Sequence, residues 1–398
     1  MRRALSLVGW WTVSTAGFAL PQQPVTRADA VTAALARGGR AAIGRADTTA
    51  AAAVLHTARL YPNPALAATY TKDVPHYHLI ADLPLDLPWL RSARIGAAAA
   101  AQDAARYGFA FERAAIRFDV DTTYTRALAA LAWARLSRRN AGDADSLVKM
   151  AELRRQVGDV SDLDVRLAAV SAGHLENAAA DDSLAAVEAL VAVQLAMGLP
   201  AEEPTITLTD SLAPPTDTVS PASGEPLPIA AAVASLRSAE RLLTLARRSV
   251  FAAPSLQLGV EQGDPTGPGG LLPTVGLSLP LPLFNWNGGE VAQAAAARER
   301  AQANVDLVRR ETVAALARTQ RALALATARV DRDRRLLASA DRVAAMSLTA
   351  YAEGAVALPN VLEAQRNTRE ALGRYIDDLA AAGNAAAALR FLTAADRP

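Results

Sequence analysis

The stretch Leu279-Pro280-Leu281-Pro282-Leu283 repeats, in similar form, a stretch near the start of the chain. The earlier copy, Leu83-Pro84-Leu85-Asp86-Leu87, lies about 196 residues before it. The same offset relates Gly158-Asp159-Val160 to Gly354-Ala355-Val356. In each half, short segments punctuated by proline and glycine precede a very long stretch without proline. The sequence therefore predicts two structurally equivalent halves, each a strand pair followed by a long helical hairpin.

The composition excludes several classes of protein. The formal net charge is +1, basic and acidic residues interleave, and no electropositive stripe indicates a nucleic-acid partner. The absence of cysteine excludes a disulfide scaffold, a thiolate zinc site and a thiol nucleophile. Alanine is abundant and aromatic residues make up only 5% of the 398 residues, which favours closely packed helices over a large globular core.

The N-terminus resembles a secretory signal peptide over residues 1–19. Arg2 and Arg3 precede an apolar run from Ala4 to Ala19, and polar glutamines follow. The alternative is an anchoring helix, because the run is only slightly shorter than a membrane span. No later segment has eighteen uninterrupted, strongly apolar residues, so the rest of the chain is not expected to cross a membrane as helices.

Two segments, 61–88 and 254–284, are predicted to form strand pairs. Tyr61-Pro62-Asn63-Pro64 ends the preceding helical segment 20–60, which itself has a break at Gly38-Gly39. Apolar and polar residues then alternate, from Tyr77 to Leu87 in the first pair and up to Leu283 in the second. Such a pattern fits either a half-buried sheet or a barrel wall with lipid outside and water inside. The neighbouring helices are too long and too rich in alanine to cover the apolar face, which favours the barrel.

The segments 89–199 and 285–393, of which the second contains a single proline at its tip (Pro359), are predicted to form long helical hairpins with tips near 157–162 and 353–359. As continuous helix, the first arm would extend roughly 100 Å. The leucine and valine residues at 316, 323, 330 and 337 recur at intervals of seven, which indicates supercoiled partner helices. Between the hairpins, 200–228 is predicted to be a proline-rich linker and 229–253 a shorter helix, and 394–398 form a tail.

Four strands per chain cannot close a barrel. Open edges in lipid would leave backbone groups unpaired, at a cost on the order of several kcal/mol each. Three copies supply twelve strands, an even number typical of outer-membrane barrels. The predicted fold class is therefore mainly α with a small β part, a duplicated unit that trimerises into a 12-stranded membrane β-barrel continued by a periplasmic α-helical barrel.

Several motifs, in order and at duplicated spacing, carry a family resemblance. They are Tyr61-Pro62-Asn63-Pro64, Leu281-Pro282-Leu283-Phe284-Asn285 with Gly288-Gly289, and Tyr351-Ala352-Glu353-Gly354 followed by Asn360-Val361-Leu362-Glu363-Ala364-Gln365. The chain resembles the TolC-type outer-membrane efflux proteins, and in particular the members that serve heavy-metal and multidrug pumps. The resemblance covers nearly the whole chain after the signal segment.

The resemblance implies a homotrimeric exit duct in the outer membrane of a Gram-negative-type bacterium, with a long periplasmic extension. Its expected partners are outer-membrane lipid, a periplasmic adaptor (membrane fusion) protein and an inner-membrane pump, most plausibly of the resistance-nodulation-division (RND) type. No enzymatic activity, cofactor, metal or nucleic acid is expected. The cargo, whether metal ions, drugs or other small molecules, is expected to be selected by the pump.

The resemblance also implies two sets of functional residues at the hairpin tips. Those expected to dock on the adaptor are Val157, Gly158, Asp159, Val160, Ser161, Glu353, Gly354, Ala355 and Val356. Those expected to narrow the pore are Asp164, Tyr351, Asn360 and Glu363. Asn360 departs from the aspartate usual in the family, which leaves a single carboxylate ring at Glu363. The alternative is that Glu363 is a solvated residue paired with Arg366 or Arg369.

Other candidates for chemistry are weak. His76 and His78 alternate across a turn without further metal ligands, and His174 is isolated, so a solvated role is expected for all three. Trp89 and Trp286 stand at strand-to-helix corners and fit either interfacial anchors or ordinary packing.

Alternative functions follow from the same pattern. One is an outer-membrane channel of a type I protein secretion system, which would use the same architecture. Another is a soluble periplasmic coiled-coil scaffold, which predicts extraction without detergent and no trimeric pore. A helical enzyme is disfavoured because the sequence has no recognisable nucleophile arrangement, metal set or phosphate-binding loop.

Overall fold

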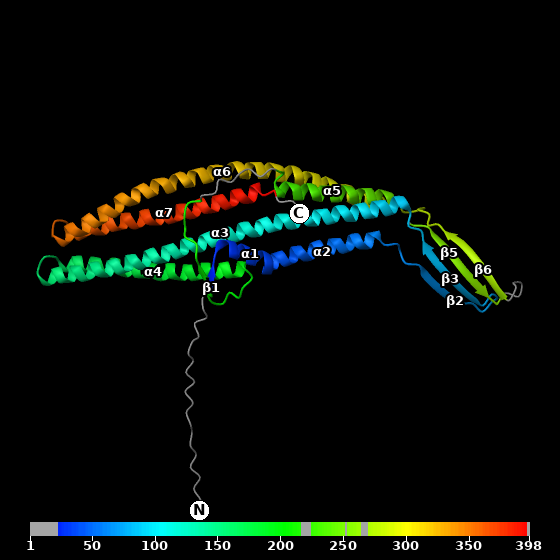
Figure 1. Cartoon of the computed structure of the whole chain (residues 1–398), viewed down its shortest axis with the longest axis horizontal. Helices are drawn as coiled ribbons and strands as arrows, with labels where there is room; N and C mark the ends of the chain where they lie inside the picture. The colour runs from blue at the N-terminus through cyan, green and yellow to red at the C-terminus, as the bar shows by residue number, and fades with distance from the viewer. Residues whose placement is uncertain (1–22, 216–223, 251–252, 264–269, 396–398) are drawn as a thin grey trace, which may run out of the picture.

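The computed structural model describes residues 23–215, 224–250, 253–263 and 270–395. The predicted signal peptide, 1–19, lies outside the described residues. The molecule is a long helical rod with a small four-stranded sheet at one end and two helical tips at the other (Figure 1). The predicted fold class, mainly helical with a small β part, is confirmed.

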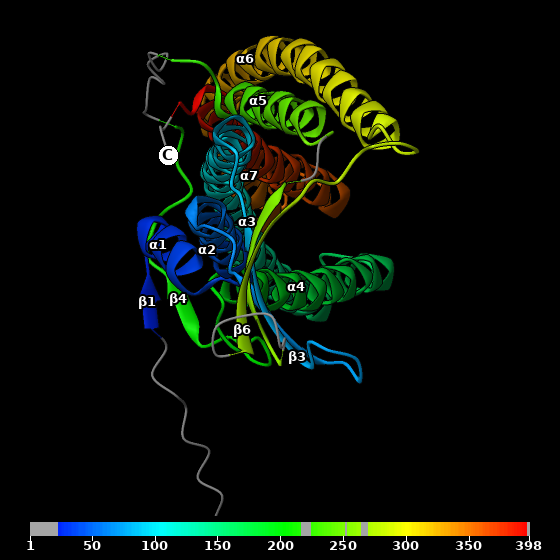
Figure 2. The same cartoon turned by 90° about the vertical axis from the view of Figure 1, so that its right-hand side faces the viewer.

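Two long helical hairpins form most of the rod. The first consists of α3 (Pro88–Gln156) and α4 (Asp162–Ala196), and the second of α6 (Gly288–Ala352) and α7 (Leu358–Thr393). The helices of each hairpin pack on one another, and α3 also packs on α7. Seen along the rod, the helices form an arc that runs from α4 through α3 and α7 to α6 (Figure 2).

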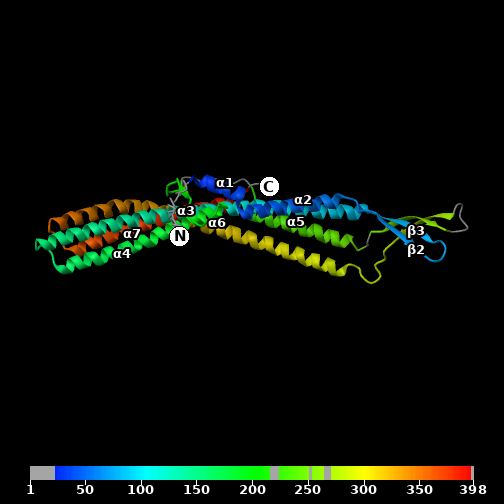
Figure 3. The ribbon, with the colours of Figure 1, turned by 90° about the horizontal axis from the view of Figure 1, so that it is seen from below.

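Three shorter helices cover the sheet-side half of the rod. They are α1 (Arg27–Arg37), α2 (Gly39–Arg59) and α5 (Leu227–Arg248). Thr26 caps α1, because its hydroxyl accepts a hydrogen bond from the Asp29 amide while the Asp29 carboxylate accepts one from the Thr26 amide. The break between α1 and α2 falls at Gly38. α2 lies along α3, and α5 lies between α3 and α6 (Figure 3).

The four-stranded sheet is antiparallel, with the order β2-β3-β5-β6. Its strands are β2 (Ala65–Tyr70), β3 (Tyr77–Pro84), β5 (Ser255–Gln262) and β6 (Leu271–Ser278). The two central strands, β3 and β5, come from different halves of the chain, so their pairing joins the halves into one sheet.

The strands are shorter than predicted. The alternating pattern predicted strand up to Leu87 and Leu283, but β3 ends at Pro84 and β6 at Ser278. Proline lacks an amide hydrogen, and Pro280 and Pro282 therefore cannot extend the ladder of β6. The repeated Leu-Pro stretches thus lie mainly in the strand-to-helix connections. α3 starts at Pro88, where proline at the first helical position is favourable.

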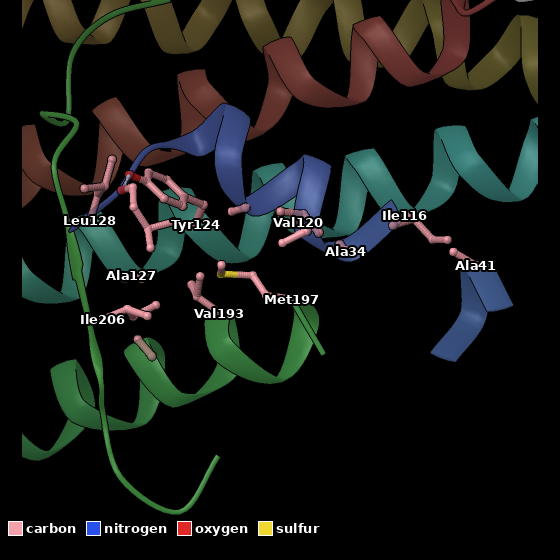
Figure 4. Close-up of a cluster of buried hydrophobic side chains, with 14 residues drawn as sticks. Ala34, Ala41, Ile116, Val120, Tyr124, Ala127, Leu128, Val193, Met197 and Ile206 are labelled. Carbon is pink, nitrogen blue, oxygen red and sulfur yellow. Dashed lines mark hydrogen bonds between the residues drawn. The ribbon is translucent and has the colours of Figure 1, made fainter. Parts of the chain in front are cut away.

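A second, unpredicted sheet lies at the middle of the rod. β1 (Gln23–Val25) pairs in parallel with β4 (Ile206–Leu208), a short strand inside the segment 200–228 that was predicted to link the two halves at the equator of the molecule. The Val25 and Ile206 side chains are buried in the largest hydrophobic cluster, between α1, α3 and α4 (Figure 4). Tyr124 donates a hydrogen bond of 2.9 Å to the Val25 carbonyl. Burial raises the pKa of Tyr124 to about 12, so this donor stays protonated.

Candidate functional site

One face of the four-stranded sheet is almost entirely apolar. The register places Leu79 beside Val260 and Ala68, and Leu258 beside Ala81 and Val275. The members of this apolar sheet face are Leu66, Ala68, Tyr70, Tyr77, Leu79, Ala81, Leu83, Leu256, Leu258, Val260, Leu271, Pro273, Val275 and Leu277, with Gln262 at its edge. No described helix packs on the sheet, and Val275 is 74% exposed. The face is thus built for an apolar surrounding that the single chain does not supply.

The opposite face of the sheet is more polar. His78 and Glu261 are register partners and their Nδ1 and Oε1 atoms lie 3.3 Å apart. The Thr71 hydroxyl lies 3.1 Å from the second ring nitrogen of His78, and Asp82 pairs in register with Gln257. Among the described residues, no group of three or more histidines and acidic residues is placed to hold a metal ion. The sheet therefore separates an apolar side from a hydrogen-bonding side.

An ion-paired carboxylate fixes the junction between sheet and helices. The Asp86 side chain is only 1% exposed, and its Oδ2 lies 2.8 Å from Arg94 and 3.3 Å from Arg91. The Arg94 guanidinium also donates to the Ala58 carbonyl at the end of α2, and Arg91 lies over the Tyr61 ring at 4.3 Å. In the sequence, Asp86 belongs to the alternating segment from Tyr77 to Leu87. Its partners come from other elements, so its structural role could not be predicted from alternation.

The two hairpin tips are sharp reversals at glycine. Gly158 and Gly354 have φ values of +85° and +77°, a conformation that disfavours any side chain with a Cβ. The residues predicted to dock on an adaptor are mainly exposed: Val157, Gly158, Asp159, Ser161, Glu353, Gly354 and Ala355, with Val160 and Val356 half-buried. The structure places both sets together at the end of the rod that lies farthest from the sheet (Figure 1).

A small hydrophobic core joins the two hairpins just behind these turns. Tyr351 of α6 is 1% exposed and packs in one cluster with Leu147 of α3 and with Leu358 and Val361 of α7. Tyr351 was predicted to line a pore constriction. In the chain its ring is buried in this tip core. Burial raises the pKa of the Tyr351 phenol, an effect that the nearby Arg154 opposes.

Arg154 ties the first hairpin to the second. Its Nη1 donates a hydrogen bond of 2.6 Å to the Tyr351 carbonyl, and its guanidinium lies 4.7 Å from the centre of the Tyr351 ring. Nothing in the local sequence singles out Arg154. A basic residue near the C-terminus of a helix is common, and only the approach of α3 to α6 gives it this role.

The other predicted constriction residues are polar: Asp164 lies on the first turn of α4, and Asn360 and Glu363 lie on the first two turns of α7. Asp164 accepts hydrogen bonds from the Ser161 amide and hydroxyl, at 3.1 and 2.8 Å, and so caps α4. Asn360 and Glu363 are exposed, and Glu363 accepts a hydrogen bond of 3.1 Å from Arg366. This ion pair is the alternative considered for Glu363, and it leaves the carboxylate accessible.

Among the described helices, none has the length and apolarity needed to cross a membrane.

Solved structures share this architecture. The outer membrane protein VceC from Vibrio cholerae is 17% identical and matches with a TM-score of 0.77, covering 93% of this chain and 96% of its own. A membrane protein from Pseudomonas aeruginosa is 19% identical with a TM-score of 0.79, covering 92% and 93%. The CmeC outer membrane channel from Campylobacter jejuni is 17% identical with a TM-score of 0.76, covering 92% and 85%. No protein-family model and no curated protein matches the sequence.

The chain has the fold of the TolC-type outer-membrane efflux channels. The resemblance drawn from the proline and glycine motifs is thereby confirmed at the level of fold. The matched proteins are described as membrane proteins and channels. In this TolC-type fold, the apolar sheet face and the glycine tips lie at opposite ends of the rod (Figure 1).

Proposed function

We propose that this protein is the outer-membrane exit duct of a tripartite efflux system. The observation that carries the proposal is the apolar sheet face. It stands clear of the helices and lies opposite a face that carries His78, Asp82, Gln257 and Glu261. A wall with this two-sided character fits lipid on one side and a water-filled lumen on the other.

Closure of that wall requires more than one chain. The outer strands β2 and β6 each have an unpaired edge, and exposed edges are not tolerated in lipid. Three copies would join β6 of one chain to β2 of the next and give a twelve-stranded barrel. The two halves of each chain would act as duplicated units that contribute two strands and one helical hairpin each.

The tip is proposed to face the adaptor and to hold the constriction. Exposed Val157 and the turns at Gly158 and Gly354 would form the docking surface. Asn360 and Glu363 would approach the three-fold axis, where three like charges repel each other and attract cations. Tyr351 would contribute indirectly, because it belongs to the buried tip core that holds α7 in place. Asp164 would contribute by capping the start of α4.

The transported substrates are proposed to be metal ions, drugs or other small molecules delivered by an inner-membrane pump. The duct itself would conduct passively, a role supported by the shared fold with the CmeC outer membrane channel. The pump and the adaptor would supply both the selectivity and the energy.

The full chain, expressed in a Gram-negative host, tests the proposal. Membranes are extracted with buffer, with salt and with detergent, the mass of the extracted particle is measured, and the particle is inserted into a planar lipid bilayer. We expect extraction only by detergent, a mass of three chains, and discrete conductance steps. A monodisperse monomer in detergent-free buffer, with the apolar sheet face protected from solvent, would refute the proposal.

A further inference from the structure

Exposed apolar residues continue beyond the ends of strands β3 and β6. In the connections to the helices they are Leu85, Leu279, Leu281, Leu283 and Phe284, which we call the connection surface. Leu283 is 69% exposed and Phe284 is fully exposed, at 100%. Contiguous exposed apolar residues indicate a surface that is covered by something outside the single chain.

The strands alone are short for a membrane wall. β3, β5 and β6 have eight residues each, and β2 has six. Eight residues extend about 26 Å at 3.3 Å per residue. At a tilt of about 40°, this length covers roughly 20 Å of membrane thickness, whereas the apolar band of outer-membrane barrels is about 25 Å tall. Residues beyond the ladder of hydrogen bonds are therefore needed to complete the band.

Proline and local hydrogen bonds reduce the number of unpaired amides in the connections. Pro280 and Pro282 have no amide hydrogen. The Leu283 amide donates to the Leu281 carbonyl at 2.9 Å, and the Leu85 amide donates to the carbonyl of the residue before β5 at 2.7 Å. An unpaired amide in lipid costs on the order of several kcal/mol. These features therefore suit a segment that lies beside lipid without belonging to the ladder.

The connections between the sheet and the helices contain one charged residue, Asp86. These connections comprise residues 60–64, 85–87, 249–254 and 279–287. The Asp86 side chain is only 1% exposed and is paired with Arg91 and Arg94 of α3. Because this carboxylate is buried and compensated, the connections present no charge of their own to their surroundings.

Exposed aromatic residues mark both limits of the apolar surface. Tyr70 and Tyr77 lie at the end of the sheet farthest from the helices, with their ring centres 5.3 Å apart. Trp89 lies in the first turn of α3, and Trp286 lies just before α6. The side chains of all four are more than half exposed. Tyrosine and tryptophan are enriched at the two interfaces of a membrane, so these residues bracket a band that includes the connection surface.

We infer that the connection surface lies in the lipid leaflet nearest the helices, where acyl chains cover it together with the apolar sheet face. The inference rests on the proposed function and extends the lipid-contacting surface beyond the strands. A second copy of the chain is the other candidate to cover these leucines. Lipid is favoured because the connections are neutral, continue the apolar sheet face and end at exposed tryptophans.

Fluorescence quenching tests the surface, because the chain has no cysteine and can be labelled at single sites. A thiol-reactive fluorophore is attached to Leu281→Cys or Leu283→Cys, and the full chain is reconstituted in vesicles of phosphatidylethanolamine and phosphatidylglycerol. Val275→Cys on the apolar sheet face is the lipid reference, and Val157→Cys at the exposed tip is the water reference. The quenchers are iodide in water and phospholipids with a nitroxide on the acyl chain.

We expect the nitroxide lipids to quench both connection sites as they quench the Val275 site, and iodide to quench them several-fold less than the Val157 site. Iodide quenching equal to that at Val157 would overturn the inference. Protection from both quenchers would also overturn it, because protein would then cover the surface. If iodide reached the Val275 site as readily as the Val157 site, the proposed function itself would be refuted.

Restoring amide hydrogens tests the role of the prolines. The variant Pro280→Ala with Pro282→Ala adds two backbone donors beside lipid. The matched control, Pro214→Ala with Pro215→Ala, removes two neighbouring prolines from the linker between the halves. We expect the first variant to lower the fraction of membrane-inserted, detergent-stable trimer several-fold and the control to leave it unchanged. Equal behaviour of the two variants would contradict this role of the prolines in the lipid-covered connections.

Discussion

The four-stranded sheet exposes its apolar residues, whereas the helical tip buries them. At the tip, Tyr351, Leu358 and Val361 are buried between the two hairpins of one chain, and charged residues lie outside. At the sheet, Leu79, Leu258 and Val275 are turned outward with nothing from the chain over them. The tip core is thus complete in a single chain. The sheet leaves its apolar face exposed in the single chain, where the proposed barrel would place lipid, and four experiments sharpen this contrast.

The largest effect is expected on the apolar sheet face. Leu258→Arg would place a charge in lipid, at a cost of about 2–4 kcal/mol in each of the three chains. The neighbour Gln257 belongs to the opposite face of the same strand, so Gln257→Arg is the matched control. We expect the first variant to lose detergent-stable trimers and the second to keep them, as measured by native gels. Equal loss in both would mean that the two faces do not differ in surroundings.

The next effect is expected in the tip core. Tyr351→Ala removes a buried ring and leaves a cavity, with an expected loss of about 3 kcal/mol in local stability. Tyr351→Phe is the control, because the phenol oxygen is buried without a hydrogen-bond partner and its removal should cost little. Hydrogen exchange of the backbone amides at the tip measures the change in local stability in both variants. Unchanged exchange in Tyr351→Ala would show that the tip does not depend on this core.

A smaller effect is expected at the glycine turns. Gly158→Ala and Gly354→Ala each force alanine into a left-handed conformation, at about 1–2 kcal/mol. At Gly354 an added Cβ would make an ordinary contact of 3.4 Å with the end of the Arg154 side chain, and the space around Gly158 is open. We expect both variants to lower the unfolding temperature by similar amounts, because the backbone strain is the same kind at each. Gly289→Ala, at the open start of α6, is the control and should stabilise the helix slightly.

The smallest effect is expected between the two ends of the rod. There, the Asp333 carboxyl group of α6 lies near the Asp378 carboxyl group of α7. Burial and the neighbouring Asp333 raise the pKa of Asp378 above the ordinary aspartate value of 3.8. The folded state then holds this proton more tightly than the unfolded state, so this contribution to stability is lost as pH rises above 3.8. Asp378→Asn should raise the unfolding temperature at pH 7 and change it little at pH 3. The same shift at both pH values would contradict this account.

The long helices and the face alternation of the sheet follow from local pattern. Proline-free stretches that end at Gly158 and Gly354 predicted the hairpins and their turns, because helix propagation and glycine at positive φ are local effects. The alternation of β3 and β5 predicted one apolar face, because side chains in strands alternate. The strands β3 and β6 end at Pro84 and Ser278, earlier than predicted. The alternation of apolar and polar residues continues beyond the last backbone hydrogen bonds between the strands, so it overestimates strand length.

What the sequence determined by itself is therefore the set of elements, their order and the sidedness of the sheet. What only the tertiary structure decided is which distant segments meet: β1 with β4, and Arg154 with the Tyr351 carbonyl. The physical reason is range. Helix propensity, capping and periodicity depend on residues a few positions apart. A contact with a partner nearly 200 positions away forms only when the helices pack, so the local sequence pattern does not predict it.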